Sequence, residues 1–534
     1  MKKLRYLLIF TILLAAWAHA TNDEASMSSV AGVIKYKLGS SQKLQIGDML
    51  VSPNSTLSNF YKSRDYQPLW ENMDINYLMK SLYEIHFDGL QKEDYYYTEI
   101  IDLIKAEHTD NLKIIESKAD LEILLSYSLL KLFNHLNNGK IDPKSLKAEW
   151  NIDKDVNNSS YMLLSSALES ENLYEFIETQ KPQLSYYKSL KKALGKFKEY
   201  KEKGGWVKVP KGSTLKPGMY DKRVLQLRDR LLATGHLLSA DNFETVQFDE
   251  QLEQAVKKFQ LHHNLNTDGV VGPNTLHELN VDVDKRINQI KVNLERARWV
   301  LNNTQKKFVI VNIAGFKAYY ADDGKILWSS RIQVGKPYRK TPVFKSEIKH
   351  LVFNPSWSVP PGIFVKDILP IVKRNPGYLS RRGFNVYDYN GNRVSPTSIN
   401  WARYTKNVPY SIRQKPGSRN ALGRVKFIFP NDYFVYLHDT PNKSLFNRDI
   451  KTFSSGCIRL EKPFELVELL LNDKEKWNKQ SIEKVVNKRK TRTVFLDEPV
   501  PIMILYWTAS ADNEGNVYFM KDIYNRDKAI LNLL

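Results

Sequence analysis

The sequence predicts a multidomain α+β protein, with a helical scaffold, a small three-helix module and a β-rich C-terminal domain that carries an inserted lid. Three observations support this class. Apolar residues recur with a helical period over 46–205, two further helical patterns fill a compact segment over 219–283, and the period changes to two after residue 304. A chain of 534 residues has room for about two to four such domains.

The N-terminus has the parts of an export signal. The charged start MKKLRY precedes the apolar run LLIFTILLAAWA, and AHA supplies small residues for cleavage after Ala20. Because this run is shorter than the ~20 residues of a spanning helix, we expect a signal peptide over 1–20 and no membrane span after its removal. The polar stretch that follows predicts a flexible N-terminus over 21–45.

The scaffold is predicted from two strong helical patterns. DLEILLSYSLLKLFNHL (120–136) and PQLSYYKSLKKALGKFKEYKEKGG (182–205) place apolar residues at i, i+3, i+4 and i+7, and the second ends on two glycines that stop a helix. Chemically reactive residues do not cluster in 46–205, so we expect this segment to be structural.

The segment 219–283 is predicted to fold into three short helices. It holds the helical patterns KRVLQLRDRLLATGHL and DEQLEQAVKKFQLHHNL and ends with the turn signals DG and GP. The run LEQAVKKFQLHHNLNTDGVVGPNTLHEL resembles the peptidoglycan-binding domain of bacterial cell-wall enzymes. Adjacent residues do not face one another on a helix, so we expect His262 and His263 at the solvated surface and not on a metal ion.

A β-rich domain is predicted over 304–534. The stretch KKFVIVNIAGFKAYYADDGKILWSSRIQVG alternates around the hairpin signal DDGK, and more strands are expected up to residue 439 and again after residue 490. PFELVELLL supplies one main helix that begins on Pro463, a residue suited to the first helical turn. A helix over 281–303 is expected to connect this domain to the three-helix segment.

An interval at about 361–422 interrupts the strand pattern. Its early part, FVKDILPIVKRNP, is expected to be helical, and its later part is expected to be loop-like and aromatic. It contains eleven Arg and Lys and two Asp, which gives a net charge of +9. Two interpretations stay open, namely a solvated basic insertion and a lid that attracts an acidic substrate.

The whole chain is basic. Its formal charge is +20, and removal of the signal peptide with Lys2, Lys3 and Arg5 leaves +17. This excess favours an acidic partner, such as nucleic acid, anionic lipid or an acidic cell-wall polymer. Export argues against nucleic acid.

Cys457 is the only cysteine of the chain, so an internal disulfide bond is excluded. An exported protein that keeps one thiol has an inert buried cysteine, an intermolecular partner or a reactive group. In FSSGCIRL, Gly456 lets the backbone approach a substrate closely, and the N–H groups of Gly456 and Cys457 are candidates for an oxyanion hole. Ser455 is expected to hydrogen-bond within this turn or to line the pocket.

His438 is the candidate base for this thiol. In DYFVYLHDT, strand alternation places Tyr436 and His438 on the face opposite the apolar side chains, so we expect His438 off the core and more exposed than a core histidine. Arg459 falls on the same side of an extended segment as Cys457 and is expected to share its pocket and to help form the thiolate. Tyr436 is expected to orient His438 or a substrate, or to pack in the core.

Eighteen residues separate His438 from Cys457, and Cys457 lies in the run SSGCIRL. This arrangement resembles the signature of the L,D-transpeptidases with a YkuD-type catalytic domain. FNPSWSVPPGI and QKPGSRNALGRVKFIFPN also resemble the segments that flank the lid in this family. The order of scaffold, peptidoglycan-binding domain and catalytic domain is similar to that of the large multidomain L,D-transpeptidases of Gram-negative bacteria. The resemblance implies a β-sandwich-like catalytic fold, Cys457 as nucleophile, His438 as base, and neither a metal nor a cofactor.

The resemblance also implies the reaction. Cys457 attacks a diaminopimelate carbonyl in a donor stem tetrapeptide, D-Ala leaves, and an amine of a second stem resolves the thioester, which gives a 3→3 cross-link in the periplasm. Gly456 and Ser455 are then oxyanion-hole and pocket residues, and Arg459 and Tyr436 bind substrate. The expected partners are acidic peptidoglycan stem peptides and proteins of cell-wall synthesis. The spacing of the residues alone predicts only acyl transfer by a thiol.

Two other functions stay open. In an L,D-carboxypeptidase or another thiol hydrolase, water would resolve the thioester in place of an amine. A papain-like peptidase is disfavoured because its cysteine precedes its histidine, whereas His438 precedes Cys457 here. A non-catalytic peptidoglycan-binding protein would need 219–283 but would not need His438, Gly456 and Cys457.

Overall fold

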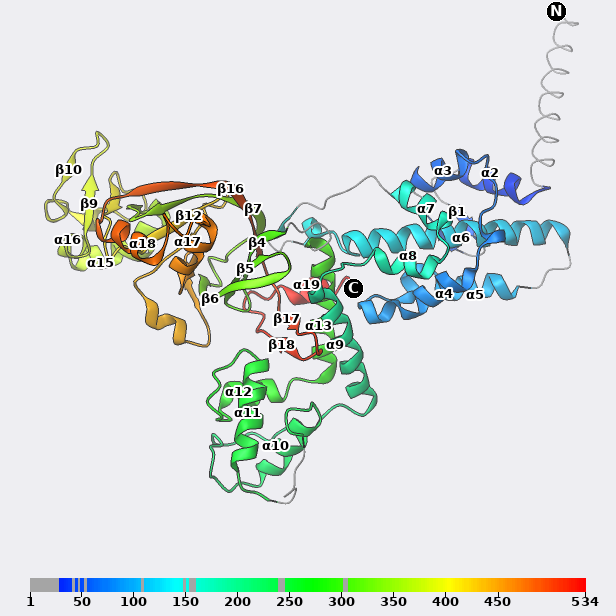
Figure 1. The fold of residues 1–534 in the computed structure, drawn as a ribbon, viewed down its shortest axis with the longest axis horizontal. Coiled ribbons are helices and arrows are strands. Elements are labelled where there is room, and N and C mark those ends of the chain that lie inside the picture. The colour runs from blue at the N-terminus through cyan, green and yellow to red at the C-terminus, as the bar shows by residue number, and fades with distance from the viewer. Residues whose placement is uncertain are drawn as a thin grey trace, which may run out of the picture.

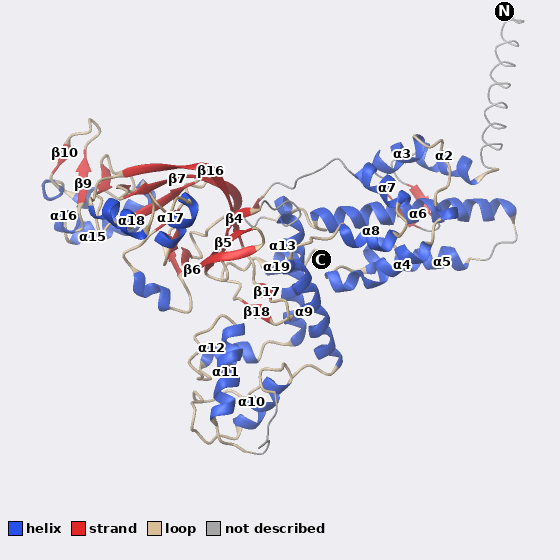
Figure 2. Cartoon of the chain, in the orientation of Figure 1, coloured by secondary structure: helices blue, strands red, loops and turns tan. Residues whose placement is uncertain are grey.

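The computed structural model describes residues 28–40, 44–46, 49–51, 55–106, 110–146, 150–152, 160–238, 245–300 and 306–534. These residues form a helical body, a three-helix module and a C-terminal sheet domain, which meet at two long helices (Figure 1 and Figure 2). The signal peptide predicted over 1–20 lies outside the described residues. Among the residues described, no helix is both long and apolar enough to cross a bilayer.

The helical body is built around the long helix α6 (Asn111–Asn138), which confirms the helix predicted over 120–136. The Asp110 side chain caps this helix by accepting a hydrogen bond from the Leu112 N–H. The other elements of this body are α3 (Ser55–Lys62), α4 (Ile75–Glu84), α5 (Tyr97–Lys105), α7 (Ser160–Glu169), α8 (Leu173–Thr179), β1 (Leu44–Ile46) and β2 (Met49–Val51), and of these α3, α5 and α7 pack against α6.

The segment predicted to be flexible over 21–45 contains a helix, α2 (Val30–Ser40). Its side chains Val33, Ile34 and Leu38 are buried in the core of the helical body, where α2 packs against α6. The prediction is therefore wrong for the described part of this segment. A short helix with one apolar face is stabilised mainly by the surface on which it packs, and the average polarity of the segment does not reveal that surface.

The three-helix module contains α10 (Arg223–Leu232), α11 (Glu250–His262) and α12 (Pro273–Leu279), as predicted. Each helix contributes to one small core, for example through Leu227, Val256 and Leu279, which are fully buried. Asp249 caps α11 by accepting a hydrogen bond from the Leu252 N–H.

The predicted surface position of His262 and His263 is wrong. The two side chains are only 8% and 7% exposed, because a hairpin of β17 (Ala509–Ala511) and β18 (Val517–Phe519) covers the end of α11. The His262 ring packs against the ring of Tyr518 with centroids 5.0 Å apart, and His263 stacks on Phe259 at 3.8 Å. The covering hairpin is distant in sequence, so the local pattern contained no sign of it.

A ten-stranded sheet forms the C-terminal domain, and an extra pairing between β12 and β7 closes this sheet on itself. The DDGK hairpin predicted from sequence joins β5 to β6. A two-residue strand that follows the helix α6 also pairs with β7, so the helical body shares the sheet. In order of pairing the strands are β12 (Val425–Ile428), β13 (Leu437–His438), β15 (Ile458–Leu460), β6 (Lys325–Gly335), β5 (Lys317–Asp322), β4 (Lys307–Asn312), β16 (Arg492–Leu505), β7 (Val343–Phe353) and β3 (Trp150–Asn151), and β14 (Thr452–Ser454) pairs with β6.

Three helices complete this domain. The predicted helix on Pro463 is α17 (Pro463–Leu471), and its apolar side packs against β6 and β16. A second helix in this region, α18 (Lys479–Asn487), was not predicted. The last helix, α19 (Asp527–Leu531), packs against the long helix α13.

The inserted segment over 361–422 has a hydrophobic core of its own, which includes Phe364, Val386 and Trp401. Its early part is helical as predicted, but the later part, predicted to be loop-like, contributes three strands to a four-stranded sheet. That prediction is wrong because the strands are short and separated by Gly, Asn and Pro, which hides their alternation. The elements are β8 (Trp357–Ser358), α14 (Pro361–Ile363), a π-helical turn (Phe364–Ile368), α15 (Leu369–Arg374), α16 (Gly377–Arg381), β9 (Phe384–Tyr387), β10 (Arg393–Val394) and β11 (Ser411–Gln414).

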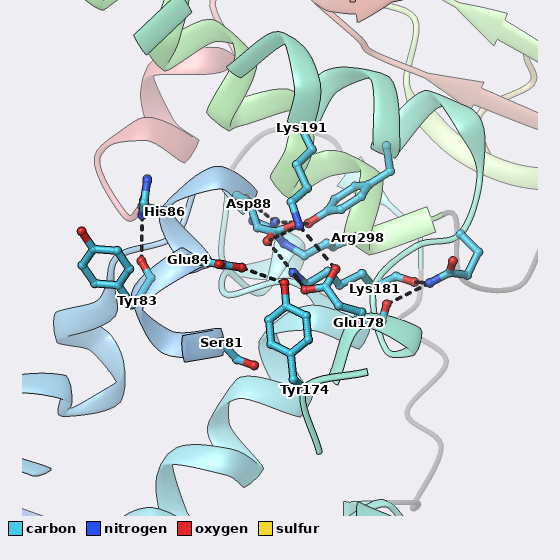
Figure 3. A network of polar contacts seen from close by, with 12 residues as sticks. Ser81, Tyr83, Glu84, His86, Asp88, Tyr174, Glu178, Lys181, Lys191 and Arg298 are labelled. Atoms are coloured by element: carbon cyan, nitrogen blue, oxygen red, sulfur yellow. Dashed lines mark hydrogen bonds and ion pairs between the residues drawn. The ribbon is translucent and has the colours of Figure 1, made fainter. Parts of the chain in front are cut away.

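Two antiparallel helices, α9 (Ser185–Glu202) and α13 (Val283–Val300), join the bodies through a buried network of charges (Figure 3). The Lys181 ammonium lies 2.7 Å from the Asp88 carboxylate of the helical body, and Arg298 of α13 donates to the Asp88 carbonyl oxygen at 2.8 Å. Arg298 also pairs with Glu295 at 2.6 Å, and both side chains are fully buried. The network therefore fixes the helical body against the C-terminal domain.

We expect Arg298→Met to reduce the free energy of unfolding by about 3–5 kcal/mol, because Glu295 would stay buried without its partner. The control is Lys201→Met, which breaks an exposed pair with Asp284 and should change stability by less than about 0.5 kcal/mol. Urea unfolding of both variants measures the difference. Equal stabilities would show that the buried network does not hold the bodies together.

Candidate active site

The site is organised by two very short strands, β13 and β15, which pair in parallel. Leu437 lies beside Ile458 and His438 lies beside Arg459, and the Ile458 N–H donates to the Tyr436 carbonyl oxygen at 2.9 Å. Leu437 and Ile458 are fully buried in the sheet core. Because side chains alternate along a strand, the neighbours of these core residues all point to the opposite face.

Four polar side chains form a row across that opposite face. Lys426 on β12 is the cross-strand partner of His438, His438 is the partner of Arg459, and Arg459 is the partner of Gln333 on β6. Cys457 precedes β15 by one residue and shares the face with Arg459. The structure therefore brings the predicted thiol, base and cation to one surface of the sheet.

His438 lies on the predicted face, but the prediction that it is exposed is wrong. Its side chain is only 3% exposed. Strand alternation correctly gives the face, whereas exposure depends on the loops that cover it, and these are not encoded in the strand itself. The ring Nδ1 lies 2.5 Å from the Asp439 carbonyl oxygen, so Nδ1 carries the proton and donates, and the ring also interacts with the backbone of Leu422.

The imidazole of His438 is uncharged at neutral pH. Burial, followed by the positive charges of Arg459 and Lys426, lowers its pKa to about 3. A neutral imidazole has one unprotonated ring nitrogen and can accept a proton, which is the state that a general base requires.

Cys457 lies on a turn whose backbone is fixed by hydroxyl groups. The Ser454 hydroxyl donates to the Cys457 carbonyl oxygen at 2.5 Å and accepts from the Gly456 N–H at 3.1 Å. From the neighbouring loop, the Thr341 hydroxyl donates to the Gly456 carbonyl oxygen at 2.8 Å. Gly456 has φ +118°, a conformation that side chains disfavour, so the turn itself requires glycine here.

Of the two predicted oxyanion-hole donors, the structure leaves one free. The Gly456 N–H is occupied by the Ser454 hydroxyl. Within the described residues the Cys457 N–H has no hydrogen-bond acceptor. Cys457 therefore offers both the thiol and the adjacent backbone donor.

The Cys457 side chain is half-buried, and its Sγ lies 3.7 Å from the Phe434 carbonyl oxygen. Burial raises the pKa of this thiol, whereas a hydrogen bond from the Tyr436 backbone and the charges of Lys426 and Arg459 lower it. Because burial prevails, the resting group is a thiol, and it needs a base before it can attack a carbonyl group.

Ser455 does not hydrogen-bond within the turn, which was one of the two expectations for it. Its hydroxyl accepts from Arg339 Nη1 at 2.8 Å. Arg339 also forms an ion pair with Asp367 in the π-helical turn of the inserted segment. The turn that carries Cys457 is thus connected to the insertion through one arginine.

Arg459 and Tyr436 occupy the predicted face. Arg459 Nη1 donates to the Gln333 side chain at 3.3 Å, but its Nε is buried without a partner, and Arg459 forms no ion pair in the described part of the chain. The Tyr436 ring lies beneath the Lys426 ammonium, 3.5 Å from the ring centroid. Tyr436 therefore contacts Lys426, a residue that the sequence did not single out.

Five residues of the site were not predicted from the sequence. Lys426 left a local signal, a charge at the second position of the otherwise apolar strand VKFI, and Ser454 bonds to Gly456 and Cys457 within its own turn. The other three reach the site through segments that only the fold brings together. These residues are Thr341, Ser454, Arg339, Gln333 and Lys426.

Three family models match the chain. A scaffold domain matches residues 55–194, a domain described as "Putative peptidoglycan binding domain" matches 220–279, and the L,D-transpeptidase catalytic domain of the YkuD family matches 306–497. Residues 306–497 form an L,D-transpeptidase catalytic domain. The thiol, the imidazole and the row of polar residues described above all lie within it.

A relative from Haemophilus influenzae, named "Putative L,D-transpeptidase", is 37% identical over 222 residues. The match covers 42% of this chain and 45% of the relative, so the chain matches less than half the length of that protein.

Two solved L,D-transpeptidase structures are also similar. That from Xylanimonas cellulosilytica is 13% identical, covers 55% of this chain and 99% of its own, and has a TM-score of 0.17. That from Stackebrandtia nassauensis is 14% identical, covers 56% of this chain and 97% of its own, and has a TM-score of 0.21. TM-scores this low give no information on the site.

We expect Gly456→Ala to destabilise the turn by about 1–3 kcal/mol, because alanine disfavours φ +118°. An added Cβ would meet its neighbours only at 3.8 Å, so backbone conformation and not crowding is the cause. The control is Gly362→Ala, where a Cβ meets nothing within 4 Å. Alkylation of Cys457 by iodoacetamide should slow in the first variant only, and equal rates in both would contradict this role of Gly456.

We expect the His438 imidazole to stay neutral from pH 8 down to about 4, since its pKa is about 3. An unfolded histidine titrates near ~6.5, so unfolding takes up a proton below that pH and stability contributed by the neutral ring is lost as the pH falls from ~6.5 toward 3. NMR of the ring protons, assigned with His438→Asn, measures the titration. A midpoint near 6.5 would contradict the buried, neutral state.

Proposed function

We propose that this protein is a periplasmic L,D-transpeptidase that forms 3→3 cross-links between peptidoglycan stem peptides through a thioester on Cys457. One observation carries the proposal. On a single face of a matched L,D-transpeptidase domain, adjacent strands carry a thiol, a neutral buried imidazole and two cations that have no acidic partner among the described residues.

In the first step, the Cys457 thiol attacks the carbonyl carbon of diaminopimelate in a donor tetrapeptide. The neutral His438 imidazole takes the thiol proton as the carbon–sulfur bond forms. The oxyanion accepts a hydrogen bond from the Cys457 N–H, a donor of a kind worth ~3 kcal/mol. His438 then returns its proton to the nitrogen of the terminal D-Ala, which leaves as the free amine.

In the second step, an amine of diaminopimelate on a second stem attacks the thioester carbonyl. His438 takes a proton from this amine, the carbon–sulfur bond breaks, and the proton returns to the Cys457 sulfur. The product is an amide between two diaminopimelate residues. If water took the place of the amine, the same site would act as an L,D-carboxypeptidase.

The charge of the site suits an acidic substrate. Arg459 has no carboxylate partner in the described residues, and its buried Nε is unpaired, so a stem carboxylate would satisfy it. The exposed Arg381, Arg382 and Arg403 belong to the inserted segment, which has a net charge of +9. This segment would attract anionic stems before they reach Cys457.

The remaining domains support attachment to the cell wall. The module over 220–279 matches a peptidoglycan-binding family, and it is fixed to the catalytic sheet domain through β17 and β18. We propose that the module holds the glycan network while the sheet domain acts on its stems. The export signal predicted over 1–20 is consistent with this location.

The decisive comparison is between the wild type and Cys457→Ala, each incubated with peptidoglycan rich in tetrapeptides. We expect 3→3 dimers and free D-Ala from the wild type and neither from the variant, because the variant lacks the nucleophile. Muropeptide analysis by mass spectrometry measures both. Identical profiles would refute the enzyme, and tripeptides without dimers would identify a carboxypeptidase.

The role of the inserted segment is tested by salt. We expect added salt to weaken binding of the wild type to isolated sacculi more than binding of a variant with Arg381, Arg382 and Arg403 changed to glutamine, because salt screens attraction between exposed charges. Co-sedimentation at several ionic strengths measures the slopes. Equal slopes would remove electrostatic recruitment by this segment.

A further inference from the structure

Lys426 has an unusual environment for a lysine. It lies on β12 as the cross-strand partner of His438, on the face that carries Cys457 and Arg459. Its ammonium is held over the Tyr436 ring, 3.5 Å from the centroid. In an antiparallel pair such partners have adjacent side chains, so the charge of Lys426 belongs to the site.

No acidic group neutralises this ammonium. Lys426 is half-buried, and in the described residues its ammonium forms neither an ion pair nor a hydrogen bond. The ionisable groups around it are Tyr436, His438, Arg459 and, on β7, His350, and the remaining group is the Cys457 thiol. A half-buried lysine without a counter-ion is costly, and burial lowers the pKa of Lys426, whereas a negative charge on Cys457 raises it.

The neutral state of His438 creates a need that Lys426 can meet. In many thiol enzymes a charged imidazolium stabilises the thiolate. Here burial, Arg459 and Lys426 disfavour an imidazolium before the proton is transferred, so a thiolate that forms in the resting site depends on other cations for its stabilisation. The same two cations lower the pKa of Cys457.

We propose that Lys426 is a positioning residue of this site, whose ammonium, held on the Tyr436 ring, stabilises the Cys457 thiolate. The inference rests on the proposed function, in which that thiolate attacks the donor stem. In this proposal, proton transfer and charge stabilisation belong to two different side chains. His438 moves the proton as a neutral base, and Lys426 supplies the charge that an imidazolium would otherwise provide.

The test is the pH dependence of alkylation of Cys457 by iodoacetamide, followed by intact-protein mass spectrometry on the wild type and Lys426→Met. Methionine keeps an unbranched apolar chain on Tyr436 but removes the charge. We expect the midpoint of the alkylation profile to rise by about one pH unit in the variant, the size expected of one unit charge near a half-buried thiol. Coincident profiles would overturn the proposal.

Three further variants control this result. Lys426→Arg keeps a cation and should restore a midpoint near that of the wild type. Lys349→Met removes an exposed charge on the neighbouring strand β7 and should leave the midpoint unchanged. If His438→Asn raises the midpoint and Lys426→Met does not, an imidazolium stabilises the thiolate and the proposal is wrong. If Lys426→Met does not fold, Lys426→Gln replaces it.

Turnover separates this role from substrate binding. We expect the loss of kcat/KM in Lys426→Met to shrink as the pH rises above the thiol midpoint, since the thiolate then forms without help. A loss of equal size at every pH would indicate contact with substrate and would contradict the proposal. A wild type that is alkylated as expected but transfers no acyl group would defeat the proposed function and leave this inference standing.

Discussion

The parallel pairing of β13 with β15 is the constraint on which the site depends. Leu437 and Ile458 are buried side by side in the sheet core, and this fixes the register of both strands. If β13 slipped by one residue against β15, His438 would point into the core while Cys457 stayed on the opposite face, and the two side chains would be separated. The chemistry is therefore positioned by apolar packing on the opposite face, and the hydroxyl groups of Ser454 in the turn and of Thr341 in a distant loop hold the turn around the thiol.

The same sheet face explains the electrostatics. Burial, together with two cations that lack acidic partners among the described residues, keeps His438 neutral, and the same cations oppose the rise that burial causes in the pKa of the thiol. Because the buried imidazole is neutral, the positive charge beside the thiol comes from groups other than His438. Arg339 contacts both Ser455 and Asp367, so one ion pair connects the inserted segment to the turn that carries Cys457.

The sequence predicted what depends on local pattern. Strand alternation predicted the face of His438, and the helical spacing of apolar residues, with turn signals, predicted α6 and the three-helix module. The sequence did not predict how exposed these side chains are, because His438, His262 and His263 are covered by segments distant in the chain. Lys426 was missed for the same reason. Its role depends on its contact with the Tyr436 ring and on the lack of an acidic partner among the described residues, and neither can be read from the local sequence.

The central claim is that Cys457 carries the acyl group. The direct measurement is the intact mass of the wild-type protein mixed with a stem tetrapeptide and no amine acceptor, with the modified residue located by peptide mapping. We expect the mass of the protein to increase by the mass of the tetrapeptide minus that of D-Ala, with the added group on Cys457. Release of D-Ala with no such adduct in rapidly quenched samples, or an adduct on any other residue, would contradict it.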